Sequence, residues 1–338
     1  MKPGKKVTYW LICCLLALSS PSLFGQGRVI VMTEADIAHE ALDETAIASR
    51  LEFMTDTLCA GRATGSAGIN AATFWLAGQF RSFGLDAPDG TYIRHFYPGD
   101  GKIGRNIVGI LRGSEKNPDG KYIILAASYD GLGILEGNFY PGADSNASGV
   151  AALCGVVTMI RKMQSIGKRY GRNVLVVALD GKNLNLSGSQ ALWNQLRSGE
   201  LTDPVTGKAI TEQSISMFVN LDQLGSTLSP LRESRPDYLL MLGSDTGRAD
   251  ATLASCNTRY GTDLDLGFDY YGSRDFTRLF YSRVSDQRIF VENGIPSVMF
   301  TSGITLNNNK VTDTADTLDL SVMKRRIWLI FHWLESII

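Results

Sequence analysis

Histidine is scarce in this sequence of 338 residues, since His39, His95 and His332 are the only three. Zinc enzymes build their sites from imidazole, thiolate and carboxylate ligands, so three histidines leave little material for a histidine-rich metal site. A basic surplus is also absent, because 33 lysines and arginines are balanced by 34 acidic residues. This balance argues against nucleic acid or an anionic membrane as the main partner.

Cysteine is equally sparse, with five residues in the whole chain. Cys13 and Cys14 fall in an N-terminal apolar segment, which leaves Cys59, Cys154 and Cys256. An odd, widely spaced set in a chain of this size is not a disulfide framework. One bridge, Cys59–Cys256, stays possible, whereas Cys154 lies on an apolar helical stripe and is expected in the core.

Residues 1–25 have the pattern of a secretory signal. Three lysines precede an apolar stretch from Val7 to about Ser19, and small or helix-breaking residues follow up to Gly25. The apolar run is shorter than the roughly 20 residues that a membrane span needs. We therefore expect an exported protein, periplasmic or secreted, with a single domain over residues 26–338 and no membrane span after signal removal.

Strands and helices are expected to alternate through the rest of the chain. Apolar, β-branched runs predict strands over 106–111, 122–127, 174–179, 215–221 and 297–300. Helical patterns cover 34–55, 68–83, 146–163 and 320–337. Such alternation predicts an α/β fold whose sheet is largely parallel and covered by helices on both faces.

Polar residues follow several of these strands. Ser128 and Asp130 come after the second run, Lys182 and Asn183 after the third, and Asp222 after the fourth. In parallel sheets the carboxyl ends of the strands meet at one edge, where ligands bind. We therefore expect a polar, carboxylate-rich crevice that also includes Asp144 and the asparagines at 307–309.

The sequence resembles the M28 family of zinc peptidases, which includes aminopeptidases and a glutaminyl cyclase branch. The resemblance covers most of the chain after the signal and lies in segments 58–62, 83–85, 142–151, 220–222, 285–286, 294–296 and 313–319. It implies a three-layer α/β/α sandwich around a mixed, mostly parallel sheet.

The resemblance also implies a site for two zinc ions, with five ligands and a glutamate as general base. Two ligand positions keep carboxylates, Asp144 as the bridging residue and Asp222. The other three ligand positions hold Ser128, Asn183 and Asn309, and the base position holds Lys182. Asp130 is in the position of the carboxylate that would orient a histidine ligand from behind.

Serine hydroxyls and asparagine amides are poor zinc ligands, and a lysine is a poor base in a carboxylate crevice. The sequence therefore favours a non-catalytic pseudo-peptidase without a cofactor, whose crevice binds a peptide or protein. The alternative is an active metallo-exopeptidase that uses the oxygen ligands to hold calcium or magnesium. A purely structural role is a third possibility, and glutaminyl cyclase chemistry is disfavoured because asparagines replace two of its ligands.

Lys182 suggests how a crevice without zinc could be stable. Two ionised aspartates about 5 Å apart repel by roughly 3 kcal/mol at an effective dielectric near 20. We hypothesise that Lys182 supplies the missing positive charge by pairing with Asp144 or Asp222. A lysine that merely points into solvent is the competing possibility.

Overall fold

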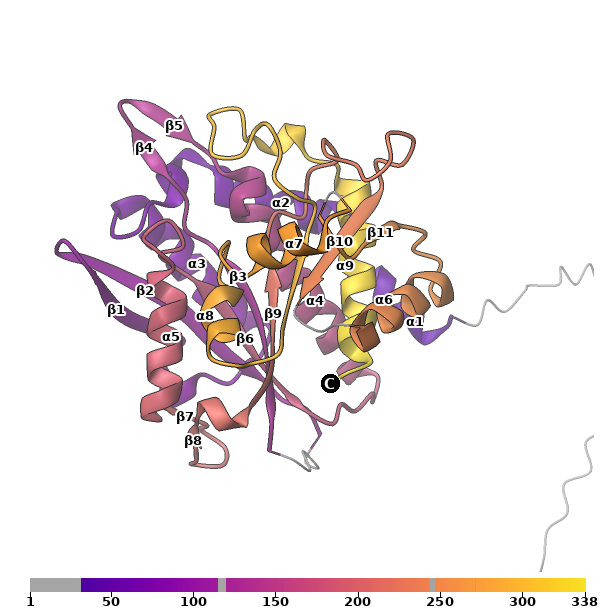
Figure 1. Ribbon diagram of the computed structural model, residues 1–338. Helices are drawn as coiled ribbons and strands as arrows, with labels where there is room; N and C mark the ends of the chain where they lie inside the picture. The colour runs from indigo at the N-terminus through magenta and orange to yellow at the C-terminus, as the bar shows by residue number, and fades with distance from the viewer. Residues whose placement is uncertain (1–31, 115–119, 244–246, 271) are drawn as a thin grey trace, which may run out of the picture. The chain divides into compact units, whose positions relative to one another are not determined.

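An eight-stranded mixed sheet forms the centre of the structure (Figure 1). The computed structural model describes residues 32–114, 120–243, 247–270 and 272–338, so the expected signal, residues 1–25, lies outside the described residues. The strands of the sheet are β1 (Ile93–Gly99), β2 (Lys102–Leu111), β3 (Tyr122–Ser128), β6 (Asn173–Leu179), β9 (Ile215–Leu221), β10 (Tyr238–Gly243), β11 (Asp265–Gly267) and β12 (Ser297–Thr301). Their spatial order is β1-β2-β6-β3-β9-β12-β10-β11.

The four central strands, β6, β3, β9 and β12, run parallel to one another. The flanking pairs β1–β2, β2–β6 and β12–β10 are antiparallel, and β11 joins β10 in parallel. The five strands expected from apolar runs are all present, so the α/β prediction is confirmed. Because the central strands share one direction, the residues after them meet at a single edge.

Helices cover both faces of this sheet. They are α1 (Glu34–Glu40), α2 (Glu44–Thr55), α3 (Ala67–Ser82), α4 (Ser148–Ser165), α5 (Ser187–Ser198), α6 (Gly247–Arg259), α7 (Arg274–Tyr281), α8 (Gln287–Glu292) and α9 (Leu320–Glu335). Short helical turns lie at Thr57–Arg62, Pro88–Gly90, Ala143–Ala147, Glu212–Ser214 and Ala315–Thr317. Two small hairpins, β4 (Gly133–Leu135) with β5 (Asn138–Tyr140) and β7 (Leu201–Thr202) with β8 (Ala209–Ile210), stand apart from the sheet.

Alternation along the strands separates two cores. In β3, Ile123 and Leu125 face the layer that contains α4 and α9, whereas Ile124 and Ala126 face the layer that contains α5 and α8. Successive strand residues point to opposite faces, so a strand buried on both sides is apolar throughout, as β3 is. The three-layer arrangement expected from the sequence is therefore confirmed.

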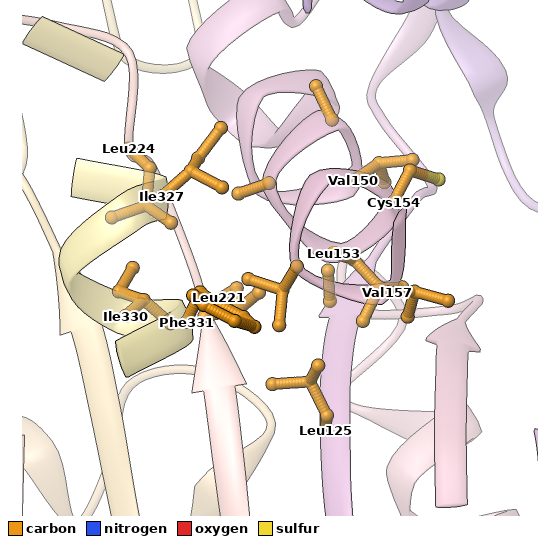
Figure 2. Close-up of a cluster of buried hydrophobic side chains, with 14 of the residues drawn as sticks. Leu125, Val150, Leu153, Cys154, Val157, Leu221, Leu224, Ile327, Ile330 and Phe331 are labelled. Atoms are coloured by element: carbon orange, nitrogen blue, oxygen red, sulfur yellow. The ribbon is translucent and has the colours of Figure 1, made fainter. Parts of the chain in front are cut away.

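Helix α4 is the central helix of the larger core. Its side chains, among them Leu153, Cys154 and Val157, belong to the same core as Leu125 and Leu221 of the sheet and Ile327 and Phe331 of α9 (Figure 2). The segment Ala143–Ser165 is apolar and long enough to cross a membrane, but 89% of its most apolar stretch is buried inside this domain, as in a core helix. Each fully buried Leu or Val contributes about 1.5–3 kcal/mol.

The three cysteines of the described chain, Cys59, Cys154 and Cys256, are free and buried. Cys154 belongs to the main core, as expected. The possible Cys59–Cys256 bridge is not formed in this structure.

Candidate functional site

A small crevice opens at the carboxyl ends of the parallel strands, with a volume of about 140 Å³. Its polar wall comes from the loops after β3, β6 and β9, from the turn before α4 and from residues 308–309, and its apolar wall comes from α7, β12 and the short segments that follow them up to residue 304. The lining residues are Asp130, Ser145, Asn146, Lys182, Asn183, Asp222, Gln223, Phe280, Val284, Met299, Thr301, Gly303, Ile304, Asn308 and Asn309. The topology thus gathers here most of the polar residues that the sequence placed after the strands.

Lys182 and Asp222 form the central contact of the crevice. The Nζ atom of Lys182 donates to both carboxylate oxygens of Asp222, at 2.6 Å each. The side chain of Asp222 is 3% exposed and that of Lys182 is 21% exposed. Burial by itself lowers the pKa of Lys182, but the negative charges of Asp222 and Asp286 outweigh it, so the pKa is raised above its usual range. The hypothesised ion pair is therefore present, with Asp222 as the partner.

Asp130 holds the backbone of the loop that carries Lys182. Its Oδ1 accepts from the Lys182 N–H at 3.0 Å, and its Oδ2 accepts from the Asn183 N–H at 3.0 Å and the Asn183 amide at 3.1 Å. Burial nevertheless raises the pKa of Asp130, against the effect of these hydrogen bonds. The function of this carboxylate in the structure is to position residues 182 and 183, not to orient an imidazole.

Asp144 does not face the crevice, which corrects our expectation. Its Oδ1 accepts from the Ser148 hydroxyl at 2.9 Å and the Gly225 N–H at 2.8 Å, and its Oδ2 is buried without a hydrogen-bond partner in the described chain. Burial raises the pKa of Asp144 to about 6. The neighbouring residue Ser145 lines the crevice instead, so Asp222 and Asp130 are the carboxylates that reach it.

The turn that directs Asp144 away is fixed by a distant carboxylate. Asp313 accepts from the N–H groups of Asp144 at 2.7 Å and Ser145 at 3.0 Å. Burial raises the pKa of Asp313, although these two hydrogen bonds oppose the shift. With the backbone held at both positions, the side chain of Ser145 points toward Asn308, whose Oδ1 accepts its hydroxyl at 2.8 Å.

Comparison with known proteins agrees with this architecture. The profile of Peptidase family M28 matches residues 106–334. The chain belongs to peptidase family M28. This confirms the family resemblance that the sequence segments indicated.

Solved structures with the same fold come from several organisms. LapB from Legionella pneumophila superimposes with a TM-score of 0.67 at 18% identity, over 90% of this chain and 75% of that one. BSAP, a zinc aminopeptidase from Bacillus subtilis, gives 0.64 at 12% identity, over 87% and 95% of the two chains. A glutaminyl cyclase from Macrostomum lignano gives 0.68 at 13% identity, over 95% of each. At such identities the likeness establishes the fold of this M28 chain.

The remaining ligand positions of this M28 chain differ in their placement. Asn183 and Asn309 line the crevice, but Ser128 is buried at the end of β3, where its carbonyl and hydroxyl oxygens lie 3.2 and 3.4 Å from the amide nitrogen of Asn146. Within the part of the chain that the structure describes, no group of three or more His, Cys, Asp or Glu side chains is arranged to hold a metal ion. The crevice of this M28 protein is therefore lined by one ion pair, one fixed carboxylate and several neutral amides.

None of the three histidines reaches the crevice. His95 is exposed on β1, whereas His39 of α1 and His332 of α9 contact each other, with their Nε2 atoms 2.9 Å apart. His39 and His332 also stack on the rings of Trp328 and Tyr260, which agrees with the structural role expected for these two.

Sequence reasoning missed several members of the site. Gln223 donates to Asn308 at 2.7 Å, and both join Ser145 in one hydrogen-bonded group. Gln223 directly follows Asp222, so its position after β9 was a usable signal. Phe280 and Met299 of the apolar wall carried no such signal, because their core-like side chains reach the crevice only through the placement of α7 and β12.

Proposed function

We propose that this M28 protein is a pseudo-peptidase, whose crevice binds a peptide segment without hydrolysing it. The observation that carries the proposal is the ammonium of Lys182, 2.6 Å from each carboxylate oxygen of Asp222. The family resemblance assigns Asp222 to a metal. In this protein the ammonium of Lys182 already binds both oxygen atoms of that carboxylate.

The residues present do not fit the two zinc ions of the family. A catalytic zinc site needs at least three protein ligands of the imidazole, thiolate or carboxylate type. Asp222 is paired with Lys182, and Asp130 accepts hydrogen bonds from two backbone N–H groups. The positions filled by Ser128, Asn183 and Asn309 offer only neutral oxygen atoms, which are weak zinc ligands.

The position of the general base supports the same proposal. A base must have a free lone pair within reach of the proton that it removes. The side chain of Lys182 is an ammonium that donates two hydrogen bonds to Asp222, so it has no lone pair to offer. Asp130, the carboxylate of the crevice wall beside residue 183, accepts hydrogen bonds from the N–H groups of Lys182 and Asn183 and from the Asn183 amide.

The lining of the crevice supports a peptide or protein as its ligand. The amides of Asn183, Asn308 and Asn309 combine donors and acceptors, as a peptide backbone does. Phe280 and Met299 on the opposite wall offer a contact for one apolar side chain. We further propose that the protein is exported to the periplasm or secreted, and that residues 26–338 form its single functional domain.

The test combines metal analysis with an activity assay. Purified protein is dialysed against zinc at trace-metal concentrations, its metal content is measured by mass spectrometry, and aminopeptidase turnover is measured with added zinc, calcium or magnesium. We expect less than 0.1 equivalent of bound metal and no turnover above a heat-inactivated control.

Two outcomes would overturn the proposal. Stoichiometric zinc with turnover that Asp222→Ala abolishes and exposed Asp275→Ala retains would establish an active zinc peptidase. Turnover that depends on calcium or magnesium, with the same response to the two variants, would establish the hard-cation exopeptidase. The oxygen-rich wall of the crevice is the observation that favours this second candidate.

A further inference from the structure

The charged side chains of the crevice are engaged within the chain. Among the described lining residues they are Asp130, Lys182 and Asp222. Asp130 is 1% exposed and accepts three hydrogen bonds, two from backbone N–H groups and one from the Asn183 amide. Both oxygen atoms of Asp222 are bound by Lys182, and its side chain is 3% exposed. A ligand that enters the crevice therefore meets almost no carboxylate surface.

One further carboxylate lies close enough to act on this wall. The charge of Asp286 helps to raise the pKa of Lys182, although Asp286 is not one of the lining residues. Its side chain is fully buried and accepts from the Ser189 hydroxyl. Burial raises the pKa of Asp286 to about 7, so this carboxyl group is mostly protonated in slightly acidic solution. Asp286 therefore offers a ligand no contact and, in such solution, no full charge.

Uncharged amides are the polar groups of the crevice that remain open. Asn183 and Asn309 are exposed lining residues. The Nδ2 of Asn183 donates to Asp130, which leaves its Oδ1 to accept. The Oδ1 of Asn308 already accepts two hydrogen bonds, which leaves its Nδ2 to donate. One open acceptor and one open donor match the N–H and C=O groups of a peptide backbone.

The apolar wall is fixed by Tyr270. The ring of Phe280 stacks on that of Tyr270 with centroids 4.9 Å apart, and the Ile304 N–H donates to the Tyr270 hydroxyl at 2.7 Å. Phe280, Ile304 and the buried Met299 all line the crevice. A volume of about 140 Å³ beside this wall admits one aliphatic side chain with its adjoining peptide groups.

From this arrangement we infer that the crevice takes a neutral peptide segment, internal or blocked at its N-terminus, in preference to a free amino terminus. The inference rests on the proposed function, since it specifies which peptide the crevice binds. A terminal ammonium that entered would lose its water without gaining an accessible carboxylate, which is unfavourable. The backbone of a neutral segment pairs with the open amides, and its aliphatic side chain contacts the apolar wall.

Two small probes with the same side chain test the inference. Leucinamide has a free amino group, and N-acetyl-leucinamide has a neutral amide in its place. The Kd of each for the purified protein is measured by NMR titration at about pH 6.5, below the usual pKa of an α-amino group, which is near 8. We expect N-acetyl-leucinamide to bind more tightly, by about tenfold or more. At about pH 9.5 the amine is neutral, so leucinamide should gain affinity and N-acetyl-leucinamide should not.

A pair of variants in α7 assigns the binding to the crevice. Phe280→Ala removes the ring from the apolar wall and is expected to weaken N-acetyl-leucinamide binding by about fivefold or more. Leu279→Ala is the matched control, because Leu279 is 49% exposed and is not one of the lining residues. It should bind as the wild type does. The comparison of the two probes uses the wild type alone, so it holds even if Phe280→Ala is poorly folded.

Three outcomes would overturn the inference. They are leucinamide binding as tightly as N-acetyl-leucinamide or more tightly at about pH 6.5, no binding of either probe, and equal affinity in the wild type and a folded Phe280→Ala. Release of leucine from leucinamide, measured in the same samples, would instead refute the proposed loss of hydrolysis. The two failures are distinguishable, because one concerns the order of two affinities and the other concerns turnover.

Discussion

The ammonium of Lys182 lies 2.6 Å from both carboxylate oxygens of Asp222, at the carboxyl end of β9. The carboxylate is almost fully buried, with 3% of its side chain exposed. A buried charge is tolerated only with a partner, so this pair fixes the electrostatics of the crevice. In this chain of the M28 fold, a lysine ammonium is therefore the cation next to the buried carboxylate.

Replacing Lys182 by Met is expected to destabilise the protein by about 3–5 kcal/mol, because Asp222 would remain buried without its partner. The free energy of unfolding is measured by urea denaturation. The double variant K182M/D222N should return to within about 1 kcal/mol of the wild type, since it removes both charges. Exposed Lys208→Met is the control, and a loss below about 1 kcal/mol in K182M would contradict the prediction.

Gly149 lies where α4 begins against the end of β9. A Cβ atom there would lie 2.4 Å from the carbonyl oxygen of Leu221 and 2.4 Å from the amide of Asn146. We expect Gly149→Ala to cost about 2 kcal/mol of unfolding free energy, because helix and strand must separate.

Gly78 in α3 is the matched control, since nothing lies within 4 Å of its Cβ position. Gly78→Ala should gain up to about 1 kcal/mol from helix propensity. Equal effects of the two substitutions on thermal unfolding would show that the close contacts at Gly149 do not make a Cβ atom there destabilising.

Arg62 connects the loops that lie before and after the small hairpin β4–β5. Its guanidinium is fully buried and donates to the carbonyl oxygens of Tyr129, Pro141 and Gly142 at 2.8 Å each, and also to that of Met54. Burial lowers the pKa of Arg62 to about 10.

Arg62→Lys is expected to lose about 3 kcal/mol of stability, because a single ammonium cannot reproduce the planar fork. Exposed Arg81→Lys should change the stability by less than about 0.5 kcal/mol. Urea denaturation of the two variants checks this, and equal stabilities would refute the role given to Arg62.

The pair His39–His332 makes stability depend on pH. Burial, and next the charge of His332, lower the pKa of His39 from 6.5 to about 4, while Asp36 opposes the shift. Between pH 6.5 and pH 4 the unfolded chain takes up a proton at His39 that the folded protein does not. The stabilisation is therefore complete above pH 6.5 and is lost as the pH falls toward 4.

Unfolding free energies at pH 7.5 and pH 4.5 measure this effect. His39→Phe keeps an aromatic ring against Trp328, on which His39 stacks at 3.9 Å, and removes the proton site. Its loss of stability across this range should be smaller than that of the wild type by about 1–2 kcal/mol, a figure reduced for the partial exposure of His39. Exposed His95→Gln should behave as the wild type, and an unchanged pH profile in His39→Phe would exclude this histidine as the cause.

The elements that the sequence predicted are those with an unambiguous apolar pattern. The runs 122–127 and 215–221 match β3 and β9, and the helical pattern 320–337 matches α9 within two residues. Strand β10 and helix α5 were not predicted. The run of β10 is apolar but has no β-branched residue, unlike the runs that predicted the other strands, and the apolar positions of α5 are spaced among polar residues that also suit a loop.

The polar side of the crevice could be inferred from strand ends alone, and Lys182, Asn183, Asp222 and Asn309 all line it. The direction of a side chain within one turn could not be inferred. Asp144 and Ser145 are adjacent, but hydrogen bonds from their N–H groups to Asp313 decide which of the two faces the crevice. Asp313 lies 169 positions further along the chain, so no local pattern contains this information.

The sequence by itself determined the layers of this protein, its family and the chemistry of the residues at the strand ends, because these depend on local apolar patterns and residue types. Only the tertiary structure decided which carboxylates meet a cation. Asp222 reaches Lys182 and Asp144 does not. The physical reason is that a charge pair forms only where the two charged groups come within a few ångströms of each other. Which groups come that close is decided by the packing of α4 against β9 and by backbone hydrogen bonds between distant segments.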